Sequence, residues 1–203
     1  MAFLAGLWLA TPPAQANIDL QWRPITQTVN VGDPVGVGLF ACSDNAQNQG
    51  FSSVQVIMEW DPGFLRLTGN DDAGAVDWMG GSSFIPGDSF GINEADPPAD
   101  GDGMWVGMVT FQQERWATPA GTLLTTITFD ALAETPGTLV GMLADSSTHP
   151  HPPHPIGLTK MLNLQSQDVL GSFGAYATVI IVPEPACLAL CALGLLVVGA
   201  RRR

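Results

Sequence analysis

The sequence has little charge and few basic residues. Charged side chains make up 13% of its 203 residues, and 7 basic residues stand against 19 acidic ones, for a formal net charge of −12. Outside the last three residues, the basic side chains are only Arg23, Arg66, Arg115 and Lys160. Because proteins bind phosphate backbones through clustered Lys and Arg, this composition argues against nucleic acid as a partner.

Cysteine is also scarce, with three in the whole chain. Cys42 lies in the body of the sequence, whereas Cys187 and Cys191 lie in an apolar run near the C-terminus. This distribution gives no internal disulfide framework. Cys42 stands in a strand-like context with no partner histidine in a recognisable motif, so we expect a small buried hydrophobe and not a nucleophile.

No catalytic constellation is present in the sequence. The three histidines, His149, His151 and His154, all lie in the proline-rich segment THPHPPHP, and there is no Gly-x-Ser-x-Gly motif. The intervening prolines keep that segment extended, which separates the rings and disfavours a metal site. We therefore expect this segment to be a surface loop, and we expect the protein not to be an enzyme.

Convincing helical periodicity is missing from the body of the chain, which has 23 glycines and 16 prolines. Short runs instead alternate apolar and polar residues between turn signals such as Gly32-Asp33-Pro34 and Asp61-Pro62-Gly63. This pattern predicts eight to ten strands in a single all-β domain over residues 17–181, an antiparallel β-sandwich. The outward residues include Thr126 and Thr128, and the predicted inward residues are Val37, Leu39, Val56, Met58, Leu124, Ile127 and Phe129.

The first 16 residues have the pattern of a signal peptide. An apolar stretch, Met1 to Ala10, is followed by Thr-Pro-Pro and then Ala14-Gln15-Ala16, the small-x-small pattern that signal peptidase requires. We expect cleavage after Ala16 and export of the protein. The alternatives are an apolar first strand or a membrane anchor, although ten residues are too few to span a bilayer.

The C-terminus, residues 182–203, carries three features in a fixed order. Val182-Pro183-Glu184-Pro185 is followed by an apolar run from Ala186 to Ala200 and then by Arg201, Arg202 and Arg203. As a helix the run would be about 22 Å long, which is short for a bilayer but enough for a transmembrane helix if the arginines snorkel to the cytoplasmic headgroups. An ordinary C-terminal anchor after a proline-rich stalk is the alternative.

This three-part tail resembles the PEP-CTERM sorting signal of Gram-negative bacteria that make extracellular polysaccharide. The resemblance implies that an integral-membrane exosortase recognises the tail and cuts near the Pro-Glu-Pro motif. The expected route passes through a transient inner-membrane intermediate to the cell surface or the extracellular matrix.

The body of the chain also resembles a known family, the cohesin-like modules of bacterial surface proteins. The residues that carry this resemblance are the runs VNVGDPVGVGLF (Val29 to Phe40), VQVIMEWDPGFLRLTG (Val54 to Gly69) and AGTLLTTITFDALAETPGTLVGML (Ala120 to Leu143). The resemblance implies a nine-stranded jelly-roll sandwich that serves protein docking or adhesion. Related sandwiches bind carbohydrate, so a module for extracellular polysaccharide is the alternative function.

Two acidic segments are candidate calcium sites. One comprises Asn70, Asp71, Asp72 and Asp77, and the other comprises Glu94, Asp96, Asp100 and Asp102. In the second, Asp100-Gly101-Asp102-Gly103 is similar to the start of a calcium loop, although the terminal glutamate of the full motif is absent. Asp100 and Asp102 are therefore candidate calcium ligands, and solvated turns are the alternative; no other cofactor is expected.

Tryptophan decides between the two functional classes. Trp60, Trp78, Trp105 and Trp116 could stack on sugar rings if they are exposed, or pack in the core of the sandwich if they are not. We expect one or two of them to face the surface. A carbohydrate-binding module needs exposed, coplanar tryptophans, whereas a protein-interaction module does not.

Overall fold

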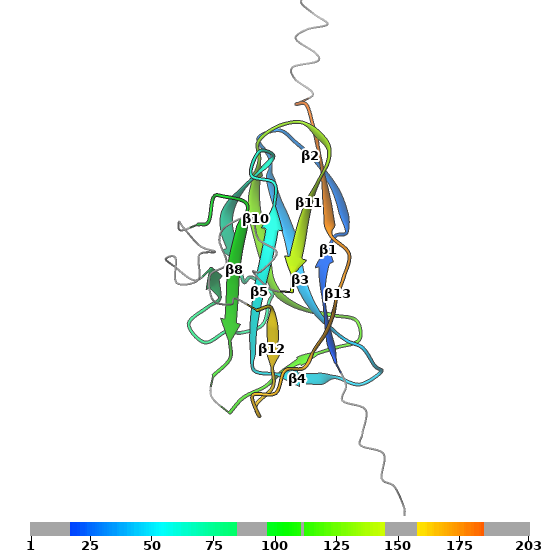
Figure 1. Ribbon diagram of the computed structural model, residues 1–203, viewed down its shortest axis with the longest axis vertical. Coiled ribbons are helices and arrows are strands. Elements are labelled where there is room, and N and C mark those ends of the chain that lie inside the picture. The colour runs from blue at the N-terminus through cyan, green and yellow to red at the C-terminus, as the bar shows by residue number, and fades with distance from the viewer. Residues whose placement is uncertain (1–16, 85–96, 111, 145–157, 185–203) are drawn as a thin grey trace, which may run out of the picture.

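A computed structural model describes residues 17–84, 97–110, 112–144 and 158–184, and in these ranges the regular elements are all β-strands (Figure 1). Their bounds in chain order are β1 Ile18–Arg23, β2 Thr26–Asn30, β3 Pro34–Ser43, β4 Gln49–Phe51, β5 Ser53–Trp60, β6 Leu65–Asp71, β7 Ser83–Phe84, β8 Asp102–Met108, β9 Arg115–Ala117, β10 Thr122–Ala131, β11 Thr135–Leu143, β12 Lys160–Leu162, β13 Leu170–Phe173 and β14 Ala177–Val182. The all-β prediction is confirmed for the described residues.

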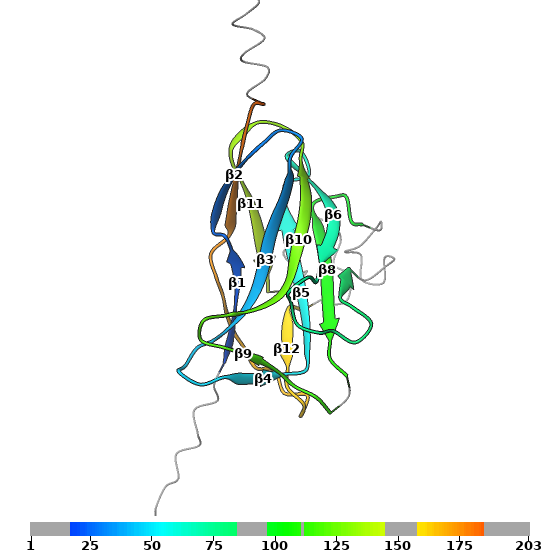
Figure 2. The same ribbon diagram turned by 180° about the vertical axis from the view of Figure 1, so that it is seen from behind.

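The strands form two large sheets that pack face to face (Figures 1 and 2). The five-stranded sheet has the order β13-β1-β3-β10-β6. The seven-stranded sheet has the order β2-β14-β11-β5-β8-β7, and β12 also pairs with β5. A small third sheet, β4 with β9, lies at one end of the sandwich (Figure 2).

The core fills the space between the two large sheets. All seven of the predicted inward residues are fully buried in it. Phe129, from the five-stranded sheet, packs edge-on against Trp60, from the seven-stranded sheet, with ring centroids 5.6 Å apart. Because alternate residues of a strand point to opposite faces, the same registers leave Thr126 and Thr128 on the outside, where both are partly exposed.

One glycine in the core is required by a close contact. A Cβ on Gly107 would lie 2.8 Å from the indole ring of Trp78, so β8 admits that ring only because residue 107 has no side chain. Trp78 in turn packs edge-on against Trp105, with centroids 5.8 Å apart, and its Nε1–H donates to the Leu124 carbonyl at 2.8 Å.

The chain changes from one large sheet to the other between its first two strands and again between its last two. β1 pairs in the five-stranded sheet and β2 in the seven-stranded sheet, and β13 and β14 divide in the same way. As a result the described residues contain fourteen strands, where the sequence pattern predicts eight to ten and the resemblance implies nine. The short strands β4, β7, β9 and β12 add to the difference.

The prediction of a purely antiparallel sandwich is wrong at this edge. β13 runs parallel to β1, and β14 runs parallel to β2. The physical reason is that the two terminal strands lie side by side and run in the same direction, with the rest of the domain as the crossover connection between them. The other ladders of the described residues are antiparallel.

Candidate interaction surface

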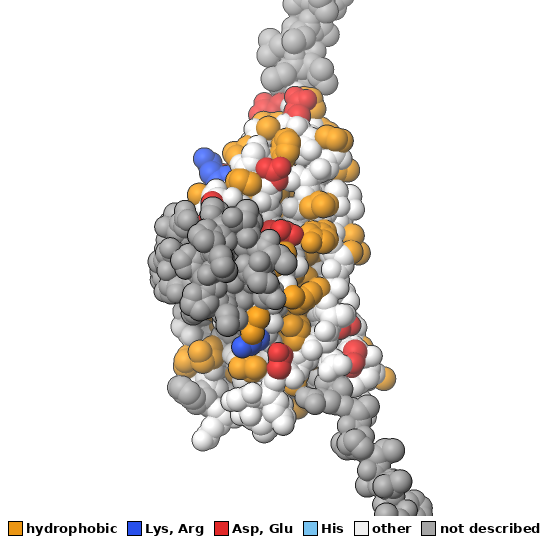
Figure 3. All heavy atoms as spheres, in the orientation of Figure 1, with side chains coloured by type: hydrophobic (Ala, Val, Ile, Leu, Met, Phe, Trp, Pro, Cys, Tyr) orange, Lys and Arg blue, Asp and Glu red, His pale blue; other side chains and the backbone are white. Residues whose placement is uncertain are grey.

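The two large sheets present very different side chains to their outer faces. On the seven-stranded sheet, the registers place Glu59 opposite Gly141, Thr178 opposite Leu139 and Ser53 opposite Met108, all on the outside. Leu139 and Met108 are each 50% exposed, and Tyr176, just before β14, is 43% exposed. We call this outer surface, formed by β5, β8, β11, β12 and β14, the apolar face. Hydrophobic side chains run along it over β11 and β14 (Figure 3).

A cleft of about 640 Å³ lies at one end of the apolar face. Its apolar walls include Phe64, Leu139 and Tyr176, and its acidic groups are Glu59, Asp61 and Asp100. The described residues that line it include no Lys, Arg or His; they are Glu59, Trp60, Asp61, Pro62, Phe64, Asp100, Gly101, Gly137, Thr138, Leu139 and Tyr176.

Tyr176 forms one wall of this cleft because of a glycine beneath it. A Cβ on Gly141 would lie 2.1 Å from the tyrosine ring, so the ring lies directly over the backbone of β11. The Tyr176 hydroxyl donates to Oε1 of Glu59 on β5, the strand beside β11, at 3.0 Å. This hydrogen bond, together with the negative charge of Glu59, raises the pKa of Tyr176 above its ordinary value.

Two smaller hollows continue the apolar face at its other end. They have volumes of about 330 and 430 Å³ and share Ser53, Met108 and Leu162 in their walls. Met79 and Leu164 extend this region and are 44% and 41% exposed. Between the hollows and the cleft, Ile57 and Met104 lie opposite each other on β5 and β8 and form a small hydrophobic cluster with Leu143.

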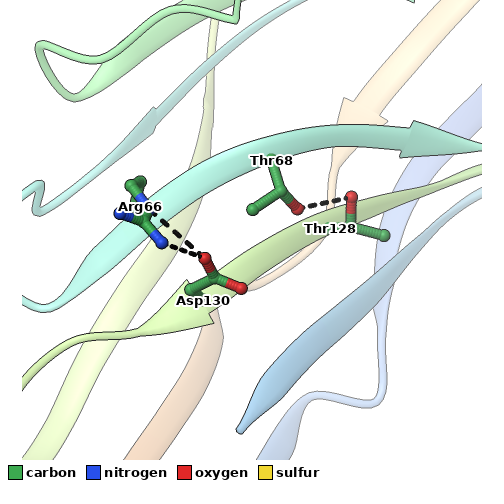
Figure 4. Close-up of polar contacts among 4 residues, drawn as sticks. All are labelled: Arg66, Thr68, Thr128 and Asp130. Carbon is green, nitrogen blue, oxygen red and sulfur yellow. Dashed lines mark hydrogen bonds and ion pairs between the residues drawn. The ribbon is translucent and has the colours of Figure 1, made fainter. Parts of the chain in front are cut away.

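The outer surface of the five-stranded sheet, here called the threonine face, is polar. Thr68 on β6 and Thr128 on β10 bond through their hydroxyls at 3.0 Å, and Arg66 on β6 forms an ion pair with Asp130 on β10 (Figure 4). In such cross-strand pairs, each polar side chain finds its hydrogen-bonding or ionic partner on the neighbouring strand. The outward apolar side chains Phe40 and Leu123 lie opposite each other on β3 and β10 and are only partly exposed, with the Arg23 guanidinium over the Phe40 ring.

The candidate calcium ligands lie beside the cleft. Asp102 opens β8 opposite Glu59 and is fully buried, and partly exposed Asp100 lines the cleft. In the described ranges no group of three or more His, Cys, Asp or Glu side chains is placed to hold a metal ion. Glu94 and Asp96 lie outside the described residues, as do His149, His151 and His154, and calcium binding stays a prediction.

The other acidic segment folds as a hydrogen-bonded loop between β6 and β7. The Asp72 carboxylate accepts from Ser82 N at 2.8 Å, from Ser82 Oγ at 2.6 Å and from Thr125 Oγ1 at 2.7 Å. Asn70 donates to Thr125 and Ser82, and Asp77 forms an ion pair with Arg115 at 3.5 Å. The loop's own carboxylates thus fasten it to the sandwich.

The tryptophans divide as expected between core and surface. Trp60, Trp78 and Trp105 are 6% exposed or less, whereas Trp116, on β9, is 53% exposed. Cys42 is buried as predicted; it accepts a hydrogen bond from Arg23 Nη2 at 3.2 Å, and its burial raises the pKa of the thiol.

Of the predicted sorting tail, the structure describes Val182, Pro183 and Glu184. Val182 ends β14 opposite Asn30 of β2, and its carbonyl accepts from Val31 N at 3.0 Å. Pro185, Arg201, Arg202 and Arg203 lie outside the described residues, as do Ala14 and Ala16 of the predicted signal peptide. Within the residues that the structure describes, no helix is long and apolar enough to cross a membrane.

Solved structures with the same fold are cohesin modules. A cohesin module of a family 33 glycoside hydrolase from Clostridium perfringens matches with a TM-score of 0.55 and 9% identity, over 83% of this chain and 99% of that one. The seventh ScaB type I cohesin from Pseudobacteroides cellulosolvens matches with a TM-score of 0.54 and 12% identity, over 82% and 93% of the two chains. The sixth cohesin of scaffoldin B from Acetivibrio cellulolyticus, in complex with a mutant Cel5 dockerin, matches with a TM-score of 0.51 and 15% identity, over 82% and 99%.

The described body of the chain has a cohesin-like fold. At these identities the likeness shows the fold alone. No protein-family model matches the chain, and no curated protein matches it. The prediction of a cohesin-like sandwich is confirmed at the level of architecture, and function is argued below from the surface.

Sequence patterns identify Trp60 and Asp100 as candidates, and both line the cleft. They do not identify Leu139, Tyr176 or Glu59. A usable signal was present, since Tyr176 is the only tyrosine in the chain and Leu139 alternates with inward Val140. The long-range pairing that brings Tyr176 next to Glu59 was not deducible from local periodicity.

Proposed function

We propose that this protein is an exported, non-enzymatic module that binds a partner protein through its apolar face. The observation that carries the proposal is the concentration of exposed apolar side chains on one outer face. Leu139, Tyr176 and Met108 lie there, whereas the threonine face pairs its polar groups internally. Exposed apolar patches rimmed by polar groups mark interaction surfaces on soluble proteins.

The structural neighbours support a protein partner. The Acetivibrio cellulolyticus cohesin was solved in complex with a dockerin, so the same fold serves protein docking there. In this chain the outer face of the seven-stranded sheet exposes apolar side chains beside hollows into which partner side chains could insert. Leu139 and Tyr176 lie at one end and Met79, Met108 and Leu164 at the other, and the outward Ile57 and Met104 between them are buried. Buried anchors in such hollows supply most of the binding energy at protein interfaces.

The tryptophans favour a protein partner over a polysaccharide. Sugar-binding surfaces need aromatic rings that are exposed and coplanar, but three of the four candidate rings are packed in the core. Trp116 is the exposed one, and it lies on β9 of the small third sheet, away from the apolar face. We therefore keep binding of extracellular polysaccharide as the second candidate, with Trp116 as the exposed tryptophan on which a sugar ring would stack.

The tail proposal is that an exosortase removes the C-terminal segment after export. The described fold is complete at Glu184, since β14 ends at Val182 and its inward side chains, Ala177, Val179 and Ile181, already lie in the core. A cut beyond Glu184 would remove no described strand. Intact-mass spectrometry of protein from the source organism tests this proposal: we expect a chain without Arg203, and recovery of a chain that retains Arg203 in cells with an active exosortase would contradict it.

The binding proposal is tested with residues 17–184, which contain every described strand and the whole described core. Immobilised domain is used to capture exported proteins of the source organism, and a captured candidate is then produced separately and titrated against variants. We expect Leu139→Asp and Met108→Asp to weaken binding at least about tenfold, because both place a charge in a desolvated contact.

The matched controls place the same charge on the other sheet. Thr126→Asp and Thr128→Asp on the threonine face should leave the affinity within about twofold. Equal losses for the two sets of variants would contradict the assignment of the face. Retardation on polysaccharide gels that is lost in Trp116→Ala would favour the second candidate function.

A further inference from the structure

The cleft at the end of the apolar face combines apolar walls with an excess of negative charge. Tyr176 and Leu139 expose 43% and 50% of their surface, and half-buried Phe64 lies beside them. Glu59 and Asp61 add carboxylates on the side of β5. An entirely apolar occupant would have to cover these charges, which is unfavourable without a compensating group.

No cation of the described residues neutralises this charge. Arg66 forms an ion pair with Asp130, and Arg115 with Asp77. Arg23 donates to the Ala120 carbonyl and lies over the Phe40 ring, on the outer side of the other sheet. Lys160 lines one of the hollows at the opposite end of the apolar face. With a net charge of −12 for the whole chain, the surrounding field also favours an incoming cation.

The tyrosine ring suits one cation in particular. One side of the ring lies against Gly141, and the residue is still 43% exposed, so the other side is open to the cleft. Its hydroxyl is fixed by Glu59 at 3.0 Å, which holds the ring and the carboxylate next to each other. A planar guanidinium stacks on an aromatic face and bonds a carboxylate in its own plane, whereas a lysine ammonium is a compact, strongly hydrated charge.

We propose that this cleft receives an arginine side chain that a partner protein presents between apolar residues. The arginine guanidinium stacks on Tyr176 and bonds the carboxylates of Glu59 and Asp61, while the neighbouring apolar side chains contact Leu139 and Phe64. A volume of about 640 Å³ accommodates one such side chain together with its neighbours. This inference rests on the proposed function, because it names the chemistry of the partner that the apolar face would bind.

The test uses a peptide probe and its neutral isostere. The probe is acetyl-Gly-Leu-Arg-Leu-Gly-amide, and the control peptide has citrulline, a nearly isosteric neutral residue, in place of arginine. Each is titrated into ¹⁵N-labelled residues 17–184. We expect saturable shifts of the Gly101, Gly137, Leu139 and Tyr176 amides with the arginine peptide, and binding of the citrulline peptide on the order of tenfold weaker.

Two charge-neutralising variants locate the effect. Glu59→Gln should weaken binding of the arginine peptide by about fivefold or more, whereas Asp130→Asn, which removes the same charge from the threonine face, should leave it unchanged. Raising NaCl to about 0.5 M should weaken the wild-type interaction, because salt screens partly exposed charge pairs.

The two proposals fail in distinguishable ways. Equal binding of the two peptides, or shifts spread over residues outside the cleft, would overturn the arginine assignment. A partner that Leu139→Asp releases but Glu59→Gln does not would also overturn it, and would leave the proposed function standing. Specific binding of the arginine peptide alongside a partner that docks on the threonine face would instead overturn the proposed function.

Discussion

The apolar face and the threonine face are built on the same core but differ in how their outward residues are satisfied. On the threonine face, Thr68 bonds Thr128 and Arg66 pairs with Asp130, so polar side chains on neighbouring strands are partners for one another. On the apolar face, Leu139 and Met108 are half exposed. The outer face of a sheet is expected to be polar in water. Exposed apolar side chains on the other sheet therefore point to a surface that a partner covers.

The largest expected effect separates the core that both faces share from the surface. Phe129→Ala should lower the free energy of unfolding by about 3 to 5 kcal/mol, because the fully buried ring packs against Trp60 and would leave a cavity. Thr128→Ser, one residue away and outward, should cost less than about 0.5 kcal/mol. Urea denaturation of both variants measures the difference, and similar losses would mean that the alternation of β10 is wrongly assigned.

A second prediction asks whether a cation stabilises the acidic end of the apolar face. If Asp100 and Asp102 are calcium ligands, millimolar Ca²⁺ should raise the melting temperature by about 2 to 4 °C, which corresponds to roughly 1 kcal/mol for a domain of this size. The control is NaCl at equal ionic strength. If Ca²⁺ raises the melting temperature no more than NaCl does, Asp100 and Asp102 are not calcium ligands.

A third prediction concerns the glycine under the tyrosine. Gly141→Ala should displace the Tyr176 ring, because the new Cβ would lie 2.1 Å from it, yet cost less than about 1 kcal/mol since an exposed side chain can move away. The matched change on the threonine face, Gly36→Ala, meets Thr126 Cγ2 at 3.2 Å and leaves Tyr176 untouched. Thermal denaturation gives the stabilities, and a large loss in Gly141→Ala would show that the ring cannot move.

The smallest effect is a titration. Tyr176 is the only tyrosine, so absorbance at high pH reports its ionisation directly. The pKa of Tyr176 should lie above the ordinary value of about 10, and Glu59→Gln should lower it part of the way toward that value, because the negative charge of residue 59 is removed while its amide oxygen can still accept from the hydroxyl. Since the folded pKa is raised, the associated stability is present below the unfolded pKa and is lost as pH rises through the folded pKa. An unchanged pKa in Glu59→Gln would show that the charge of Glu59 does not act on the tyrosine hydroxyl.

Local rules were enough to predict the long strands and their inward residues, although not the short strands β4, β7, β9 and β12. Alternation along β3, β5 and β10 identified the buried positions, since in a strand with one buried face every second residue must be apolar. The turn at Asp61-Pro62-Gly63 was also predicted correctly, and Phe64 N donates to the Asp61 carbonyl there at 3.1 Å. These features depend only on residues close together in the sequence.

Features that depend on distant pairing were not predicted. The change of sheet by the first and last strands places β14 parallel to β2, far from it in the sequence. The cleft combines residues from positions 59 to 64, 100, 137 to 139 and 176, which no local pattern connects. Asp72 illustrates the same limit: its carboxylate accepts hydrogen bonds from Ser82 and from Thr125, which lies 53 positions away in the sequence, and these bonds fasten the loop.

Photo-crosslinking from one residue on each face tests the central claim most directly. A benzophenone amino acid is placed at Leu139 on the apolar face or at Thr128 on the threonine face, and the exported protein is irradiated in the source organism. We predict a discrete covalent adduct with another protein from position 139 and none from position 128. An adduct from position 128 alone, or equal adducts from both positions, would contradict the assignment of the apolar face as the binding surface.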